Sequence, residues 1–286
     1  MEAEDPSRSW PRQWTKEPKF DFQDITYDKK YFDQGGIGRI TINRPQRMNA
    51  LTRTSMREIV AALMDISHDK TIGVGVLTGS GDKAFCAGGD VEWEQGGGLQ
   101  IQLIEHVSLN RMIRLCRKPL IAAVKGYAIG GGNHWAYFCD LTIAAENAVF
   151  GQNGPKVGSP ADGYIVSYLS RVVGAKKARE MWLLCRRYSA EAALAMGLVN
   201  EVVPLDKLDE EVEKWCQEIL ALSPTCIEIL KRSFDAEDDH LLHNTQWWHE
   251  IMSPNFTASE ECKEGGVAFK EKRRPDWGRF RRSSEH

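Results

Sequence analysis

The chain has 286 residues, of which 42% are hydrophobic and 27% are charged, and its formal net charge is -3. This composition is typical of a globular protein with one large core, or with a core domain and an appendage. A slightly negative net charge gives no general attraction for nucleic acid or for anionic membranes, so we expect neither as a partner.

The first twenty residues are polar and contain no apolar stretch of the kind found in secretory signals. The longest apolar run, residues 120–124, is far too short to cross a bilayer. The seven cysteines are odd in number and show no Cys-x-x-Cys spacing, so we expect reduced thiols and no metal site. These features predict a cytoplasmic enzyme with residues 1–20 as a polar N-terminal extension.

Strands and helices are expected to alternate after this extension. Alternating or continuous apolar residues predict strands at 37–43, 71–78, 120–124 and 141–144. Apolar residues at helical spacing predict helices at 54–64 and 101–115. This order implies an α/β layered architecture, and we assign residues 21–204 to one core domain.

Two glycine-rich turns each follow an apolar stretch and precede an expected helix. They are Phe-Cys-Ala-Gly-Gly-Asp at 85–90 and Gly-Tyr-Ala-Ile-Gly-Gly-Gly at 126–132. Backbone N–H groups at a helix start have no partner inside the helix, and glycine lets the backbone approach a ligand closely. One such turn alone is usually structural. Two that converge would form an oxyanion hole for a carbonyl that gains negative charge.

The pattern changes after Pro204. Apolar residues at helical spacing predict a helix over 208–222, and a second helix is expected to start near Cys226. No strand is expected beyond this point, so residues 205–286 form a helical region that ends in a basic tail. We interpret the tail as a solvated face and not as a nucleic-acid patch.

The paired turns resemble those of the crotonase (enoyl-CoA hydratase/isomerase) superfamily in order, spacing and flanking residues. Matching segments lie at 40–45, 48–51, 139–145, 150–152 and 195–199, so that the resemblance covers roughly residues 20 to 280. It implies a repeated ββα spiral core with a C-terminal helical trimerisation region. It also implies a homotrimer, or a homohexamer formed as a dimer of trimers.

The resemblance further implies an acyl-CoA substrate, with coenzyme A as the carrier and no tightly bound cofactor. Gly89 and Gly131 would donate their N–H groups to the thioester oxygen. The positions expected to contact coenzyme A are Asn49, Ala50, Ala87, Asp90 and, in the tail, Lys272.

The chain departs from ordinary hydratases at the positions of their two catalytic glutamates. These positions hold His134 and Gly154, so water addition by paired carboxylates is disfavoured. His134 lies just inside an expected helix start, where the helix dipole favours the neutral, basic imidazole. We interpret it as a general base or an orienter of water, with a purely structural role as the alternative.

Residues 150–159 and 176–186 resemble two groups within the superfamily, the 1,4-dihydroxy-2-naphthoyl-CoA synthases and the 2-ketocyclohexanecarboxyl-CoA hydrolases. Both reactions proceed through an oxyanion-stabilised enolate. In bicarbonate-dependent synthases, glycine replaces the second glutamate and bicarbonate, held by a Gln and a Trp, acts as the base. Gln152, Gly154 and Trp182 match these positions, although core packing is an equal interpretation of Trp182.

Both groups also carry a Ser-x-Asp motif, which is altered here. The string is Ser159-Pro160-Ala161-Asp162, so Ala161 occupies the aspartate position and Asp162 follows one residue late. The proline-constrained turn either returns the Asp162 carboxylate to the site or points it elsewhere. Ser159 and Tyr164 are candidate hydrogen-bond donors to a substrate oxo group, with packing as the alternative for Tyr164.

These residues predict an enzyme that makes or breaks a carbon–carbon bond in a cyclic β-oxoacyl-CoA, with ring-opening hydrolysis favoured over Claisen ring closure. Asp162 or His134 would handle the water. One alternative is hydration or isomerisation of an enoyl- or dienoyl-CoA with His134 in place of glutamate. The other is a non-catalytic, CoA-binding member of the superfamily.

Overall fold

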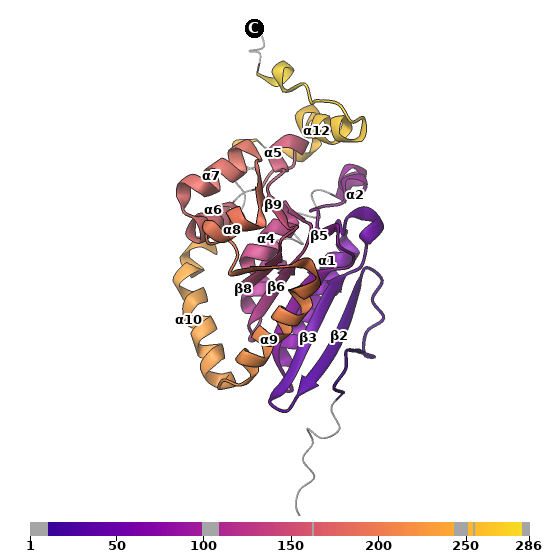
Figure 1. Cartoon of the computed structure of the whole chain (residues 1–286). Coiled ribbons are helices and arrows are strands. Elements are labelled where there is room, and N and C mark those ends of the chain that lie inside the picture. The colour runs from indigo at the N-terminus through magenta and orange to yellow at the C-terminus, as the bar shows by residue number, and fades with distance from the viewer. Residues whose placement is uncertain (1–10, 99–108, 162, 243–250, 254, 282–286) are drawn as a thin grey trace, which may run out of the picture.

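A computed structural model describes residues 11–98, 109–161, 163–242, 251–253 and 255–281. Two sheets and a set of surrounding helices form the fold (Figure 1). The helices are α1 (Arg53–His68), α2 (Val91–Trp93), α4 (Gly131–Phe138), α5 (Gly154–Val157), α6 (Gly163–Val173), α7 (Ala175–Leu184), α8 (Ala190–Ala195), α9 (Leu208–Leu220), α10 (Pro224–Leu242) and α12 (Glu260–Lys270). Short helical turns are η2 (Pro45–Arg47), η3 (Glu94–Gly98), η4 (Leu205–Lys207), η5 (Phe256–Ala258) and η6 (Trp277–Phe280).

The larger sheet has seven strands in the order β1-β2-β3-β4-β6-β8-β11. The pairs β1–β2 and β2–β3 are antiparallel, and the remaining neighbours are parallel. Its strands are β1 (Thr15–Lys16), β2 (Ile25–Phe32), β3 (Gly35–Ile42), β4 (Ile72–Gly79), β6 (Leu120–Val124), β8 (Leu141–Ala145) and β11 (Glu201–Val203).

Helices cover both faces of this sheet, which explains the continuous apolar run of its central strand. Leu120 and Ala122 of β6 belong to the core that contains α1, whereas Ile121 and Ala123 pack in the core that contains α9. A strand buried on both faces is apolar at every position, because successive side chains point to opposite sides. The helix α9, which lies in the region 205–286 assigned to oligomerisation, therefore packs on the sheet of the core domain.

The smaller sheet has the order β10-β9-β7-β5. Its strands are β5 (Ala84–Cys86), β7 (Tyr127–Ile129), β9 (Val149–Gly151) and β10 (Arg187–Ser189). Along the chain, β4 of the larger sheet is followed by β5 of the smaller one, β6 by β7, and β8 by β9. Each of these pairs is followed by a helix. This repetition is the ββα spiral that the resemblance implied, and the parallel strands β5, β7 and β9 each lead into a turn at the same end of the fold.

The strands at 37–43, 71–78, 120–124 and 141–144 are confirmed to within one or two residues as β3, β4, β6 and β8. The helix expected at 54–64 is longer, and of the helix expected at 101–115 only residues 109–115 are described, all helical. The extension was wrongly bounded at residue 20, since β1 pairs with β2 and adds a strand to the sheet.

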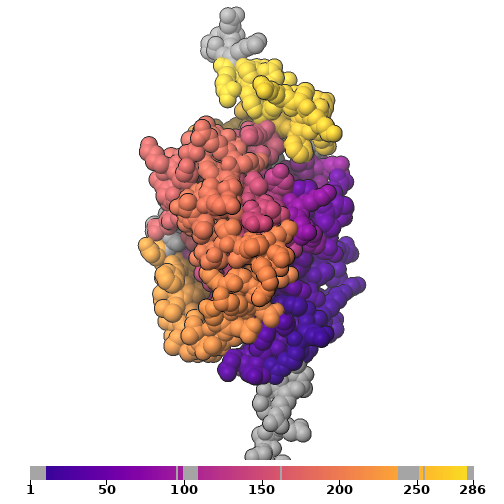
Figure 2. All heavy atoms as spheres, in the orientation of Figure 1, coloured from indigo at the N-terminus to yellow at the C-terminus, as the bar shows by residue number. Residues whose placement is uncertain are grey.

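The C-terminal region is helical as expected, and the described part holds no strand after β11. The last helix, α12, packs on α5 and lies with the following residues at one end of the molecule (Figure 2). Within the described ranges, no helix is both long and apolar enough to cross a membrane.

Candidate active site

A cavity of about 440 Å³ lies where the turns after β5, β7 and β9 meet α5 and α12. Ligands of α/β folds commonly bind at the carboxyl ends of parallel strands, and β5, β7 and β9 are parallel. The wall combines glycine backbone, apolar side chains and polar groups. Predicted site residues in this wall are Ala50, Ala87, Gly89, Asp90, Gly131, His134, Gln152, Gly154, Ser159 and Trp182.

The two glycine-rich turns converge in this wall. Gly88 has a φ of +95°, and a Cβ placed on it would lie 3.1 Å from the Ile129 oxygen and 3.5 Å from the Gly131 nitrogen. A side chain would therefore separate the two turns. Gly131 is the first residue of α4, so its N–H has no partner within the helix.

Backbone pairing with Leu51 orients the first turn. The Leu51 N–H donates to the Gly88 oxygen at 2.8 Å, and the Leu51 oxygen accepts from the Asp90 N–H at 2.9 Å. In a parallel bridge of this kind the residue between the two bonds, Gly89, directs its own N–H away from the partner strand. Gly89 and Gly131 both line the cavity, which is the arrangement that an oxyanion hole requires.

His134 lies in the first turn of α4 and is buried. Its Nε2 is 3.1 Å from Oε1 of Gln152, the residue that follows β9. Its ring centroid is 5.4 Å from that of Trp182 on α7. With Gln152 Oε1 as the acceptor, Nε2 carries the hydrogen and Nδ1 is the basic nitrogen.

Gln152 and Trp182 each contribute a further side-chain N–H group next to the cavity. Gln152 Nε2 and Trp182 Nε1 are both buried and have no hydrogen-bond partner within the described residues. Both residues line the cavity. A buried donor without an acceptor is costly, so a ligand oxygen that accepts these hydrogen bonds would be favoured.

The cavity offers little carboxylate chemistry near His134. A Cβ on Gly154 would lie 2.6 Å from the Ser159 oxygen, so the loop geometry excludes a side chain where hydratases carry their second glutamate. The acids in the described wall are Asp90, Glu92 and Glu94, all from the segment after β5. Asp162 lies outside the described residues.

The chain can be compared with known proteins on this basis. A family model described as "Enoyl-CoA hydratase/isomerase" matches residues 33–280. The chain belongs to the enoyl-CoA hydratase/isomerase family. The crotonase superfamily predicted from the two turns is thereby shown, and with it the fold class.

Solved structures of the family are similar over most of the chain. An enoyl-CoA hydratase/isomerase from Xanthobacter autotrophicus Py2 is 30% identical, with 88% of this chain and 94% of that chain covered and a TM-score of 0.77. A carnitinyl-CoA hydratase from Mycobacterium avium is 30% identical, with coverages of 90% and 99% and a TM-score of 0.75. A methylmalonyl-CoA decarboxylase in complex with 2-nitronate-propionyl-CoA is 26% identical, with the same coverages and a TM-score of 0.79.

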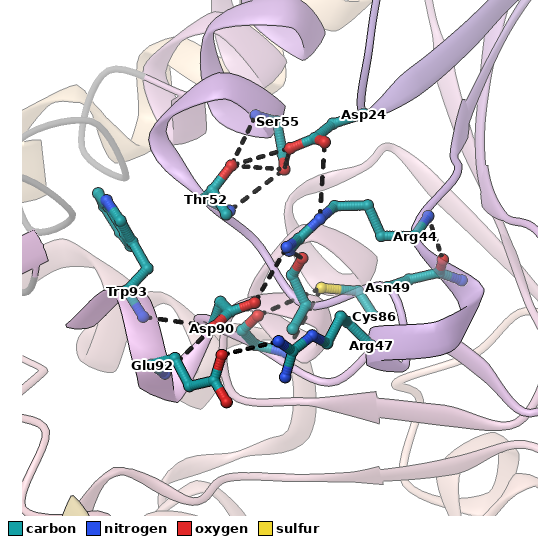
Figure 3. Close-up of polar contacts among 12 residues, drawn as sticks. Asp24, Arg44, Arg47, Asn49, Thr52, Ser55, Cys86, Asp90, Glu92 and Trp93 are labelled. Carbon is teal, nitrogen blue, oxygen red and sulfur yellow. Dashed lines mark hydrogen bonds and ion pairs between the residues drawn. The ribbon is translucent and has the colours of Figure 1, made fainter. Parts of the chain in front are cut away.

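Two residues expected to contact coenzyme A have structural partners around the first turn (Figure 3). Asn49 accepts from the Arg44 N–H and donates to the Ser80 and Ala84 oxygens, and it is not in the cavity wall. Asp90 caps α2 and forms a 3.0 Å ion pair with Arg44. Burial raises the pKa of neighbouring Cys86 to about 12, so its thiol is protonated and is not a nucleophile.

Tyr164 is placed away from the cavity wall. Its ring packs against Phe138, at 5.3 Å between centroids, and against Tyr168, at 5.2 Å. It does not belong to the wall, and these ring contacts favour the packing role over a hydrogen bond to a substrate oxo group. Ser159, by contrast, lines the cavity together with Ala161.

At the end of α12 the cavity is lined by a cation two residues before the expected Lys272. Lys272 is exposed and does not belong to the cavity wall, whereas Phe269 and Lys270 at the end of α12 line it. Glu264 holds the tail in place, since it accepts from Arg273 at 2.6 and 3.1 Å and from the Asp276 N–H at 2.7 Å.

Sequence reasoning missed Arg187, which lines the cavity from β10. No motif identifies it, because its position depends on the pairing of β10 with β9. The described residues contain no group of three or more His, Cys, Asp or Glu side chains able to hold a metal ion.

Proposed function

We propose that this chain is an acyl-CoA enzyme that opens the ring of a cyclic β-oxoacyl-CoA by hydrolysis, through a thioester enolate. The observation that carries this proposal is the donor-rich pocket around His134, in which His134 and Gly154 stand where a hydratase would place two carboxylates. The family assignment supports a CoA thioester as substrate, as does the 2-nitronate-propionyl-CoA bound by a similar decarboxylase.

The thioester oxygen would lie between the Gly89 and Gly131 amides. Backbone donors aimed at this oxygen stabilise the negative charge that it gains when the α-carbon becomes an enolate. The N-terminus of α4 adds a favourable dipole at the same place. The remaining wall of the cavity then receives the acyl group.

His134 would act on water. As the water oxygen adds to the ring carbonyl carbon, His134 accepts one water proton. The bond from this carbon to the α-carbon then breaks, and its electron pair passes to the thioester oxygen as an enolate. The proton moves from His134 to the α-carbon, so the ring ketone becomes a carboxylic acid and the thioester remains intact.

Gln152 Nε2 and Trp182 Nε1 would hold the ring oxo oxygen as it becomes an alkoxide. The same two donors could instead bind a bicarbonate ion. Bicarbonate bound there would supply a base for enolate formation. A ring-closing synthase would then depend on added bicarbonate, whereas ring opening by His134 would not.

Hydration or isomerisation of an enoyl-CoA is the second candidate. It is favoured by the hydratases among the similar structures. In this reaction His134 would move a proton at the acyl chain without change to the carbon skeleton.

Incubation of the purified protein with 2-oxocyclohexanecarboxyl-CoA tests the proposal. Ring opening adds one water and gives pimeloyl-CoA, which mass spectrometry separates from the substrate. Exchange of the α-proton in heavy water without ring opening would favour the isomerase. Tight CoA binding without turnover of cyclic β-oxo, enoyl or dienoyl esters would select a non-catalytic member.

We also propose a homotrimer or a dimer of trimers. Large apolar side chains are exposed on α10 of the single chain, namely Ile229 at 59%, Leu230 at 54% and Phe234 at 74%. An exposed apolar face of this kind is typical of a surface that another subunit covers. Sedimentation velocity measures the state directly.

A further inference from the structure

Arg187 lies level with the second glycine-rich turn. In the smaller sheet, Arg187 of β10 pairs with Gly151 of β9, and Ile129 of β7 pairs with the same Gly151. Ile129 directly precedes Gly130 and Gly131. Adjacent strands are about 4.8 Å apart, so Arg187 starts about 10 Å across the cavity floor from this turn.

The side chain of Arg187 is folded across β9. A Cβ on Gly151 would lie 2.8 Å from one terminal guanidinium nitrogen and 3.1 Å from Cδ, so only glycine leaves room for this path. The guanidinium donates to the Gln152 oxygen at 2.5 Å and to Asn153 Oδ1 at 3.0 Å. These two bonds hold it beside the residue that contacts His134.

The charge of Arg187 has no carboxylate partner within the part of the chain that the structure describes. Both of its acceptors are neutral, and partial burial lowers the pKa of the guanidinium. Its neighbour Arg186 is also exposed but differs in its partner, since it forms a 3.1 Å ion pair with Glu180. Arg187 is therefore an oriented cation in the cavity wall with donors left for a ligand.

We propose that Arg187 binds a carboxylate at the far end of the acyl group. A planar guanidinium with a fixed fork of donors matches a carboxylate in bidentate geometry. This inference rests on the proposed ring opening, which creates such a carboxylate. A pimeloyl chain is long enough to reach from a thioester at the glycine-rich turns to β10.

Calorimetric binding of three probes tests this role: pimeloyl-CoA, its terminal methyl ester, and coenzyme A alone. We expect the wild type to bind the acid at least about tenfold more tightly than the ester, as a charge-assisted pair requires. Arg187→Met should abolish this preference and leave the affinity for coenzyme A unchanged. Arg186→Met, the matched control, should retain the full preference.

Two results would overturn the inference. One is a wild type that does not distinguish the acid from the ester. The other is an Arg187→Met variant that binds all three probes more weakly by the same factor, which would assign Arg187 to a CoA phosphate. Should Arg187→Met fail to fold, Arg187→Lys can be used instead. Lysine keeps the charge but lacks the bidentate guanidinium, so this variant should retain only part of the preference for the acid over the ester.

Binding and turnover separate this inference from the proposed function. A wild type that prefers the acid but does not open 2-oxocyclohexanecarboxyl-CoA would refute ring opening and keep the role of Arg187. A wild type that opens the ring but does not prefer the acid would support ring opening and refute the role of Arg187.

Discussion

The two ends of the cavity differ in the chemical groups that line them, which are backbone amides at one end and side chains at the other. At the end proposed to bind the thioester, hereafter the thioester end, the proposed donors are backbone amides of the turns after β5 and β7, fixed by strand pairing and by glycine. At the end proposed to bind the acyl group, hereafter the acyl end, they are side chains from α4, the turn after β9, α7 and β10, segments that meet only in the folded chain. Backbone donors keep their place whatever side chains change, so reaction type can vary at the acyl end while the thioester end stays constant.

The largest expected effect is at the thioester end. Gly131→Pro removes the amide hydrogen at the first position of α4, where proline is compatible with the helix. We expect kcat to fall by about 100- to 1,000-fold, as when other enzymes lose one oxyanion donor. Steady-state kinetics with 2-oxocyclohexanecarboxyl-CoA measures this loss.

Gly131→Ala is the matched control, because alanine keeps the N–H. It should retain far more activity than the proline variant. If the two variants lose activity equally while both remain folded, the amide of residue 131 is not the donor.

His134→Gln tests the acyl end. Glutamine keeps hydrogen-bonding capacity but not a basic nitrogen, so we expect kcat to fall by about 100-fold with little change in melting temperature. His68→Gln is the control, because His68 is exposed at the end of α1 and does not line the cavity. A His134→Gln enzyme with wild-type kcat would leave His134 with a structural role only.

Trp182→Phe should have a smaller effect, since it keeps an aromatic ring and removes only the Nε1–H. We expect about a tenfold loss in kcat/KM, the value of one hydrogen bond to a developing charge. The affinity of the variant for coenzyme A, measured by calorimetry, should be unchanged. An unchanged kcat/KM would indicate that Trp182 serves packing alone.

The smallest effect concerns α12, which contributes Phe269 and Lys270 to the cavity. Bonds from Arg273 and the Asp276 N–H lower the pKa of Glu264 to about 2, from 4.5. Because the folded-state pKa is lowered, the contribution of Glu264 is complete above pH 4.5 and is lost as the pH falls towards 2.

Hydrogen-exchange protection of residues 260–281 should follow this pH dependence in the wild type. Glu264→Gln should show lower protection at neutral pH and little change between pH 5 and 2. Equal profiles for both proteins would contradict the role of Glu264.

Much of the fold and of the thioester end could be predicted from sequence. Apolar runs such as Leu120–Val124 and the glycines at 88–89 and 130–132 reflect local requirements for burial and backbone conformation. Such requirements act on neighbouring residues, so the chain order alone reveals them. The family of the chain followed from the same residues and is confirmed by the family match.

The acyl end was harder to predict because it depends on long-range placement. Tyr164 was a candidate for either a substrate contact or packing, and its packing against the rings of Phe138 and Tyr168 depends on how α4 and α6 meet. Lys270 was not considered as a contact, because the end of α12 and its orientation towards the cavity were unknown from sequence. Arg187 was missed since only the β9–β10 register brings it to the cavity.

A crystal structure with a non-hydrolysable analogue of 2-oxocyclohexanecarboxyl-CoA tests the central claim most directly. The account predicts that the oxygen corresponding to the thioester carbonyl lies within hydrogen-bonding distance of the Gly89 and Gly131 nitrogens, with the ring facing His134. An oxygen directed away from both amides would contradict it.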